Sequence, residues 1–263
     1  MLNDLHTTAY GGSGSRLLFL HGLFGQGRNW TQIAKTLAEN YRVTLVDLPD
    51  HGRSAWLEDF DLVEVADRVA GLVATDDPVA LVGHSLGGKV AMVLALRHPA
   101  LVERLCVVDI APVDYAQLSE FSGYIEAMRG LDLTSLTQRS DAEDALAAQV
   151  PNPVVRSFLL QNLRREPDPE GETGWRWQPN LEGLRRSLPA IKSWPAEALG
   201  ASRYDGPVLW VGGERSDYIT DDYAPVMDRL FPHNRRVTIK GAGHWVHSEK
   251  PEVFVEVLRR FLS

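Results

Sequence analysis

Short apolar runs alternate along the chain with longer segments in which apolar and polar residues follow helical spacing. The runs have the length of buried strands and lie at residues 16–20, 42–46, 79–82, 104–110, 207–211 and 234–240. Between two of them, residues 62–72 place Val65, Val69 and Leu72 on one helical face and charged residues on the other. Such strands, alternating with helices, predict an α/β protein with a mostly parallel central sheet flanked by helices.

This alternation stops in the middle of the chain. Residues 115–203 contain no strand-like run of comparable quality, and helical patterns are expected there at residues 121–129, 140–149, 154–163 and 181–191, with a turn-rich stretch at 166–174. We therefore predict a core formed by residues 1–114 and 204–263 and an all-helical cap formed by residues 115–203, inserted after the sixth strand. The aromatic residues of the cap are candidates for lining a pocket, because active-site loops emerge at this side of such a sheet.

Composition narrows the class of partner. The 263 residues are 44% hydrophobic and 24% charged, and a net charge of −8 argues against nucleic acid or an anionic membrane surface. No apolar stretch approaches the ~18 residues of a membrane span, and a signal-peptide pattern is missing. The single cysteine, Cys106, fits a reducing compartment. We expect a cytoplasmic protein that acts on a small molecule and does not insert stably into a membrane. The oligomeric state does not follow from composition.

One motif carries specific chemistry. Residues 83–87 read Gly-His-Ser-Leu-Gly, between the apolar run 78–82 and a helix of small residues over 88–96. A G-x-S-x-G between a strand and a helix is typical of the nucleophile elbow of serine hydrolases, where a tight turn excludes bulky neighbours. Ser85 is therefore the predicted nucleophile. The amide of Leu86, at the start of the helix, is expected to donate to the oxyanion that forms on attack.

A serine nucleophile needs a base and an acid that orients the base. His244 lies in a Gly-rich loop between the last strand and the last helix, which is the position of the base in this arrangement. Two carboxylates qualify as the acid. Asp109 closes an apolar strand, where a buried carboxylate needs a donor such as a histidine N–H, and Asp217 follows a later strand near the more usual position. We predict Asp109 and keep Asp217 as the alternative.

The second oxyanion donor is expected in the loop after the first predicted strand. The segment His21-Gly-Leu-Phe-Gly25 lets the backbone approach a reacting carbonyl, and the amide of Leu23 is the predicted donor, with Phe24 as the alternative. Residues 50–54 are predicted to form a structural turn, with no catalytic role for His51. Metal ligands at recognisable spacing and phosphate-binding glycine loops are absent from the sequence, so we expect neither metal nor cofactor.

These segments together resemble small α/β-hydrolases, close to bacterial carboxylesterases related to the mitochondrial abhydrolase-domain proteins. The resemblance is carried by HGLFG at 21–25, GHSLGGK at 83–89, VDIAPVDY at 108–115 and GAGHWVHSEKP at 241–251. It implies the α/β-hydrolase fold, Ser85 and His244 as nucleophile and base, and Asp109 as the acid, since the acid of that group follows the elbow strand.

The sequence therefore predicts a serine carboxylesterase that hydrolyses small to medium acyl esters through an acyl-enzyme intermediate. A thioesterase, a lipid hydrolase or an acyltransferase on the same triad remains an alternative, because fold and triad host many chemistries. A non-catalytic ligand receptor is a distant alternative. A receptor would not require Ser85 and His244, yet the sequence contains both.

Overall fold

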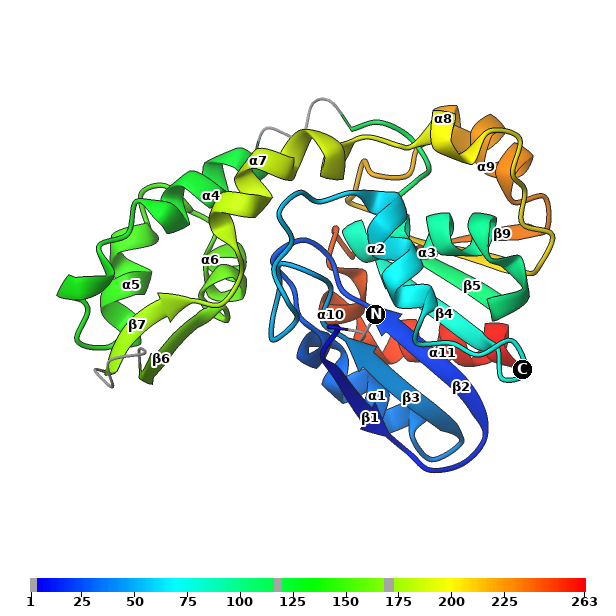
Figure 1. Cartoon of the computed structure of the whole chain (residues 1–263), viewed down its shortest axis with the longest axis horizontal. Helices are drawn as coiled ribbons and strands as arrows, with labels where there is room; N and C mark the ends of the chain where they lie inside the picture. The colour runs from blue at the N-terminus through cyan, green and yellow to red at the C-terminus, as the bar shows by residue number, and fades with distance from the viewer. Residues whose placement is uncertain (1–3, 116–119, 168–172) are drawn as a thin grey trace.

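In the part of the chain that the structure describes, a seven-stranded sheet forms the centre of the molecule (Figure 1). The computed structural model describes residues 4–115, 120–167 and 173–263. The strands of this sheet are β1 (Thr7–Tyr10), β2 (Ser15–Leu20), β3 (Tyr41–Val46), β4 (Val79–His84), β5 (Val102–Val108), β8 (Val208–Gly213) and β9 (Asn234–Ile239). Their order is β1-β3-β2-β4-β5-β8-β9. The strands from β3 to β9 pair in parallel, and β1 runs antiparallel to β3 at the edge.

Helices cover both faces of this sheet, because its strands are apolar on both sides. Leu18 and Leu20 of β2 belong to the core under α2 (Leu62–Ala70), α3 (Leu86–Arg97) and α9 (Ala224–Leu230). Leu17 and Phe19 alternate with them and pack on the opposite face. That face is covered by α1 (Thr31–Leu37) and α11 (Pro251–Leu262). The predicted α/β-hydrolase fold, with a mostly parallel sheet between helices, is confirmed.

A second group of elements lies between β5 and β8 in the chain. Its helices are α4 (Glu120–Arg129), α5 (Arg139–Leu146), α6 (Pro153–Leu160), α7 (Leu181–Lys192) and α8 (Ala196–Leu199). All of these elements except α8, which lies beside α9, form the lobe coloured green to yellow in Figure 1. We call residues 115–203 the cap throughout. The cap follows β5, the fifth strand along the chain, whereas the sequence prediction placed it after the sixth.

The prediction of an all-helical cap was wrong. Strands β6 (Leu163–Pro167) and β7 (Thr173–Trp177) form an antiparallel hairpin, and part of the predicted turn-rich stretch, residues 168–172, lies outside the described residues. The two strands are mostly charged or polar, and only Leu163 is fully buried, so the apolar signal of a strand is weak. The predicted helix over 154–163 also ends earlier, at Leu160, because Leu163 already pairs with Trp177.

The loops that carry the predicted chemistry meet at one edge of the sheet. Strands β2, β3, β4, β5 and β9 are parallel, and the candidate residues follow their carboxyl ends. Ligands of open α/β sheets bind at this edge. Among the described residues, no helix is both long enough and apolar enough to cross a bilayer.

Candidate active site

Ser85 lies in a strained turn between β4 and α3. Its φ of +51° and ψ of −117° are unusual for a residue with a side chain, and its amide donates to the carbonyl oxygen of Val108 at 3.0 Å. Glycines make the turn possible: a Cβ on Gly83 would collide with the carbonyl of Gly87, and a Cβ on Gly87 would lie 2.5 Å from the carbonyl oxygen of His21. The local geometry is that of a nucleophile elbow.

Asp109 and His244 form a hydrogen-bonded pair beside this elbow. The Nδ1–H of His244 donates to Oδ2 of Asp109 at 2.7 Å. Asp109 is 1% exposed, and its carboxylate also accepts the hydroxyl of Ser216 and, at 3.0 Å, the amide of Gly213. Three donors therefore compensate for the burial of this charge. When Nδ1 carries the single proton of the ring, Nε2 is left as an acceptor.

Asp217, the alternative acid, lies elsewhere. Its side chain is exposed and makes no hydrogen bond or ion pair within the described residues. The residue before it, Ser216, points instead at Asp109. Tyr218, the residue after it, stacks on the ring of His244 with 3.9 Å between ring centroids. The neighbours of Asp217 thus support the Asp109–His244 pair, whereas Asp217 itself does not reach it.

The two candidates for the second oxyanion donor, Leu23 and Phe24, differ in whether the amide already donates a hydrogen bond. The amide of Phe24, the alternative donor, donates to Nε2 of His51 at 3.1 Å. The amide of Leu23 meets no acceptor among the described residues. Leu86 is the first residue of α3, where N–H groups lack intrahelical acceptors. Leu23, Leu86 and Ser85 line one cavity, so both predicted donor residues lie beside the predicted nucleophile.

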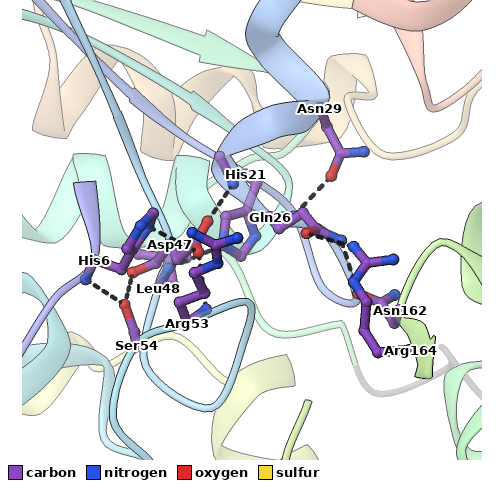
Figure 2. Close-up of polar contacts among 11 residues, drawn as sticks. His6, His21, Gln26, Asn29, Asp47, Leu48, Arg53, Ser54, Asn162 and Arg164 are labelled. Carbon is purple, nitrogen blue, oxygen red and sulfur yellow. Dashed lines mark hydrogen bonds and ion pairs between the residues drawn. The ribbon is translucent and has the colours of Figure 1, made fainter. Parts of the chain in front are cut away.

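Two buried histidines that the sequence prediction left without a role support this loop. The Nδ1–H of His21 donates to the carbonyl of Gly22 at 2.8 Å, and its Nε2 accepts the amide of Leu48 at 2.9 Å (Figure 2). The Nδ1–H of His51 donates to the carbonyl of Pro49 at 2.8 Å, which leaves its Nε2 to accept from Phe24. Burial lowers the pKa of His21 to about 3 and also lowers the pKa of His51, so both rings are neutral. The predicted turn at 50–54 thus supports the loop of residues 21–25, which carries the predicted second oxyanion donor.

Two further histidines lie next to His244. The Nε2–H of His84 donates to the carbonyl oxygen of His244 at 2.9 Å, which links the elbow to the loop of the predicted base. His247 stacks on Trp30 with 4.0 Å between ring centroids. Burial lowers the pKa of His84 well below its usual value and that of His247 to about 3. Both rings are therefore neutral next to the position where an imidazolium would form.

The cap covers Ser85 and leaves two small cavities that share Leu23, Ser85 and Phe121. The first has a volume of about 30 Å³ and is lined mainly by apolar side chains, including Leu188 of α7. The second has a volume of about 10 Å³ and is lined by His244 and by the aromatic residues Phe24, Tyr124, Phe158 and Trp245. Of the cap aromatics, Trp175 and Trp177 do not line these cavities; their indoles donate to the carbonyls of Leu136 and Met128.

Lys89 connects the elbow helix to the end of the cap. Its ammonium is buried and donates to three successive carbonyl oxygens at the end of α7, those of Ile191 at 3.2 Å, Lys192 at 2.6 Å and Ser193 at 2.7 Å. A cation is favourable at the negative end of a helix. Burial nevertheless lowers the pKa of Lys89 to about 7, against the opposing charge of Asp114. The sequence analysis assigned no contact to this lysine.

Fold and site together define a hydrolase of the esterase and lipase class. The alpha/beta hydrolase fold family matches residues 15–251, and the chain belongs to that family. It is 36% identical over 257 residues to the sn-1-specific diacylglycerol lipase ABHD11 of Mus musculus, covering 94% of this chain and 80% of that protein. It is 31% identical over 251 residues to the esterase YbfF of Escherichia coli, covering 95% and 93%. A solved structure described as a marine microorganism esterase superposes with a TM-score of 0.89 at 34% identity, covering 98% and 99%.

Proposed function

We propose that the protein is a serine carboxylesterase with Ser85 as nucleophile, His244 as general base and Asp109 as the acid that orients His244. The observation that carries the proposal is the 2.7 Å hydrogen bond from His244 Nδ1 to the buried carboxylate of Asp109, at the sheet edge that carries the elbow. This bond fixes the tautomer in which Nε2 accepts a proton. The unused amides of Leu23 and Leu86 are the proposed oxyanion donors.

The reaction has two halves. Ser85 Oγ attacks the acyl carbonyl while His244 Nε2 takes its proton, and the amides of Leu23 and Leu86 hold the oxyanion of the tetrahedral intermediate. Collapse breaks the ester bond, and His244 gives its proton to the leaving alcohol. Water then attacks the acyl-enzyme with His244 as base, which releases the carboxylic acid and restores Ser85.

The two cavities suggest where each half of the ester binds. His244 protonates the leaving group, so the alcohol belongs in the cavity that His244 lines, together with Phe158 and Trp245. The acyl chain then occupies the apolar cavity beside Leu86 and Leu188. We further propose that residues 115–203 act as the substrate-binding cap on a core of residues 1–114 and 204–263. We also propose that the enzyme is cytoplasmic, because its buried free Cys106 suits a reducing compartment.

Lipid hydrolysis is the second candidate. The apolar lining of the first cavity favours it, and the mouse relative is named a diacylglycerol lipase. The same residues would perform the same steps on a longer acyl chain. Chain-length preference therefore decides between the two candidates.

The test is hydrolysis of p-nitrophenyl esters from acetate to dodecanoate by the wild type, by Ser85→Ala and by the control Ser140→Ala, which changes an exposed serine of the cap. We expect the fastest turnover on short chains, its loss in Ser85→Ala and its retention in the control. A dodecanoate optimum would favour the lipid hydrolase. Turnover that survives in Ser85→Ala would refute the mechanism, and an inactive wild type that also resists a fluorophosphonate probe would favour a receptor.

A further inference from the structure

A side chain of the cap holds the loop that carries one of the proposed oxyanion donors. Asn162, which is fully buried, donates from Nδ2 to the carbonyl oxygen of Phe24 at 2.7 Å. Its Oδ1 accepts from Nε2 of Gln26 at 3.1 Å (Figure 2). One cap residue thus binds two residues of the loop after β2, both within three positions of Leu23.

Asn162 is presented by a firmly held turn at the end of α6. Arg139 donates to the carbonyls of Leu160 and Leu163, and Arg28 donates to that of Gln161 at 2.6 Å. The carbonyl of Asn162 itself accepts the amide of Gln178 at 2.9 Å. Cations at the carboxyl end of a helix are favourable, and here they also fix the turn. The Asn162 side chain therefore has a defined position from which to bind the loop.

The loop needs such support because Phe24 has a strained backbone. Its φ is +60°, which persists only where the surroundings impose it. The amide of Phe24 is held by His51 of the core, and its carbonyl is held by Asn162 of the cap. The amide of Leu23 lies one peptide earlier in the same turn, which Gly25 closes by donating to Gly22 at 2.8 Å. The direction of the Leu23 N–H thus depends on both contacts.

We propose that Asn162 is a positioning residue through which the cap completes the oxyanion hole. The inference rests on the proposed function of Ser85 and Leu23. Val155, Phe158 and Leu159 of α6 line the cavity proposed for the alcohol, and Asn162 lies three residues after Leu159. A substrate that packs against α6 therefore also steadies the oxyanion loop, so that binding energy from the leaving group is used in the transition state.

The test compares Asn162→Asp, which keeps the shape but replaces the Nδ2 donor, with the control Gln161→Leu. Gln161 is the preceding residue, and its Oε1 accepts from Nδ2 of Asn29, so the control removes a cap–core bond that contacts neither Leu23 nor Phe24. Asn29 keeps its own bond to the loop, in which its Oδ1 accepts the amide of Gln26 at 2.7 Å. For p-nitrophenyl butyrate we expect Asn162→Asp to lower kcat about 30-fold or more with little change in KM, approaching the loss of one oxyanion donor. Gln26→Leu, which keeps the Nδ2 donor of Asn162 but removes the bond to its Oδ1 together with the 3.4 Å bond from Arg164 to Gln26 Oε1, is expected to give a smaller loss of the same kind. A kcat equal to that of the control, or a change confined to KM, would overturn the proposal.

Hydrogen exchange separates this proposal from the proposed function. We expect the amides of residues 21–27 to exchange faster in Asn162→Asp and Gln26→Leu than in the wild type, and to be unchanged in Gln161→Leu. If wild-type turnover is absent while the exchange difference is present, the esterase assignment fails and the coupling of cap to loop stands. If turnover depends on Ser85 but exchange and kcat of Asn162→Asp match the control, the coupling alone is refuted.

Discussion

The ring of His51 accepts the amide N–H of Phe24 at 3.1 Å, a contact between two buried residues 27 positions apart in the chain. This bond engages the amide of Phe24, which is why we propose the amide of Leu23 as the oxyanion donor. We predict that His51→Leu lowers kcat for p-nitrophenyl butyrate by about 10- to 100-fold, because small misplacements of catalytic groups are costly. Steady-state kinetics check this prediction. The control is His233→Leu, which changes a histidine far along the chain from both His51 and the loop of Leu23. Unchanged kcat in His51→Leu would show that the loop keeps its geometry without the ring.

The choice between the two acids can be tested with matched substitutions. Asp109→Asn retains the shape of the side chain but removes the charge that His244 Nδ1 and the Ser216 hydroxyl contact. We expect kcat to fall about 10⁴-fold, as for loss of the acid in a serine triad. Asp217→Asn changes an exposed side chain and is expected to keep wild-type kcat. The opposite pattern in the same assay would make Asp217 the acid.

The sheet and its elbow were predictable because both depend on local patterns. Strands buried on both faces must be continuously apolar, and the turn at Ser85 requires glycines at fixed positions. The β6–β7 hairpin was not predictable in this way, because its strands are mostly polar and are held by contacts with distant cap residues. The indole of Trp177, for example, donates to the carbonyl of Met128, 49 positions away.

The supporting residues of the site were hidden from the sequence for a similar reason. Asn162 lies in a segment predicted as helix and His51 in a predicted turn, and their roles arise only when the cap and the core approach the same strained peptide at Phe24. Lys89 lies on a helix that reads as a buried element, and its three acceptors are about a hundred positions further along. Pairings over such separations leave no periodic signal.

The two cavities predict opposite changes in specificity. Phe158→Ala widens the cavity that His244 lines, and Leu188→Ala widens the other one. We expect Phe158→Ala to favour esters with bulkier alcohols and Leu188→Ala to favour longer acyl chains, each by about 10-fold in kcat/KM relative to the wild type. The measurement is kcat/KM on two ester series that vary one side at a time. If the two preferences were exchanged, the assignment of acyl and alcohol sides would have to be reversed.

Lys89 gives the stability a dependence on pH at the alkaline side. Burial lowers the pKa of Lys89 to about 7, whereas the pKa of a lysine in the unfolded chain is about 10.4. Between these values the unfolded chain binds more protons, so the free energy of unfolding rises with pH, by about 1.4 kcal/mol per unit, and is independent of this group below pH ~7. Lys89→Met removes this contribution. We expect urea unfolding of the variant between pH 7.5 and 9.5 to show a smaller slope than the wild type; equal slopes would mean that the folded protein keeps the ammonium charged throughout.

His247 gives a dependence of the same sign on the acid side, where stability also rises with pH. Burial lowers its pKa to about 3, below the ~6.5 of an unfolded histidine, so the stability it allows at neutral pH is lost as the pH falls from about 6.5 toward 3. Within that window each such ring costs about 1.4 kcal/mol per pH unit. His247→Phe keeps an aromatic ring on Trp30 and removes the proton-binding group, whose Nδ1 has no partner among the described residues. We expect urea unfolding of His247→Phe to lose stability less steeply than the wild type between pH 6.5 and 5, while His233→Phe follows the wild type. A variant that parallels the wild type would place the acid sensitivity in the other buried histidines, His21, His51 and His84.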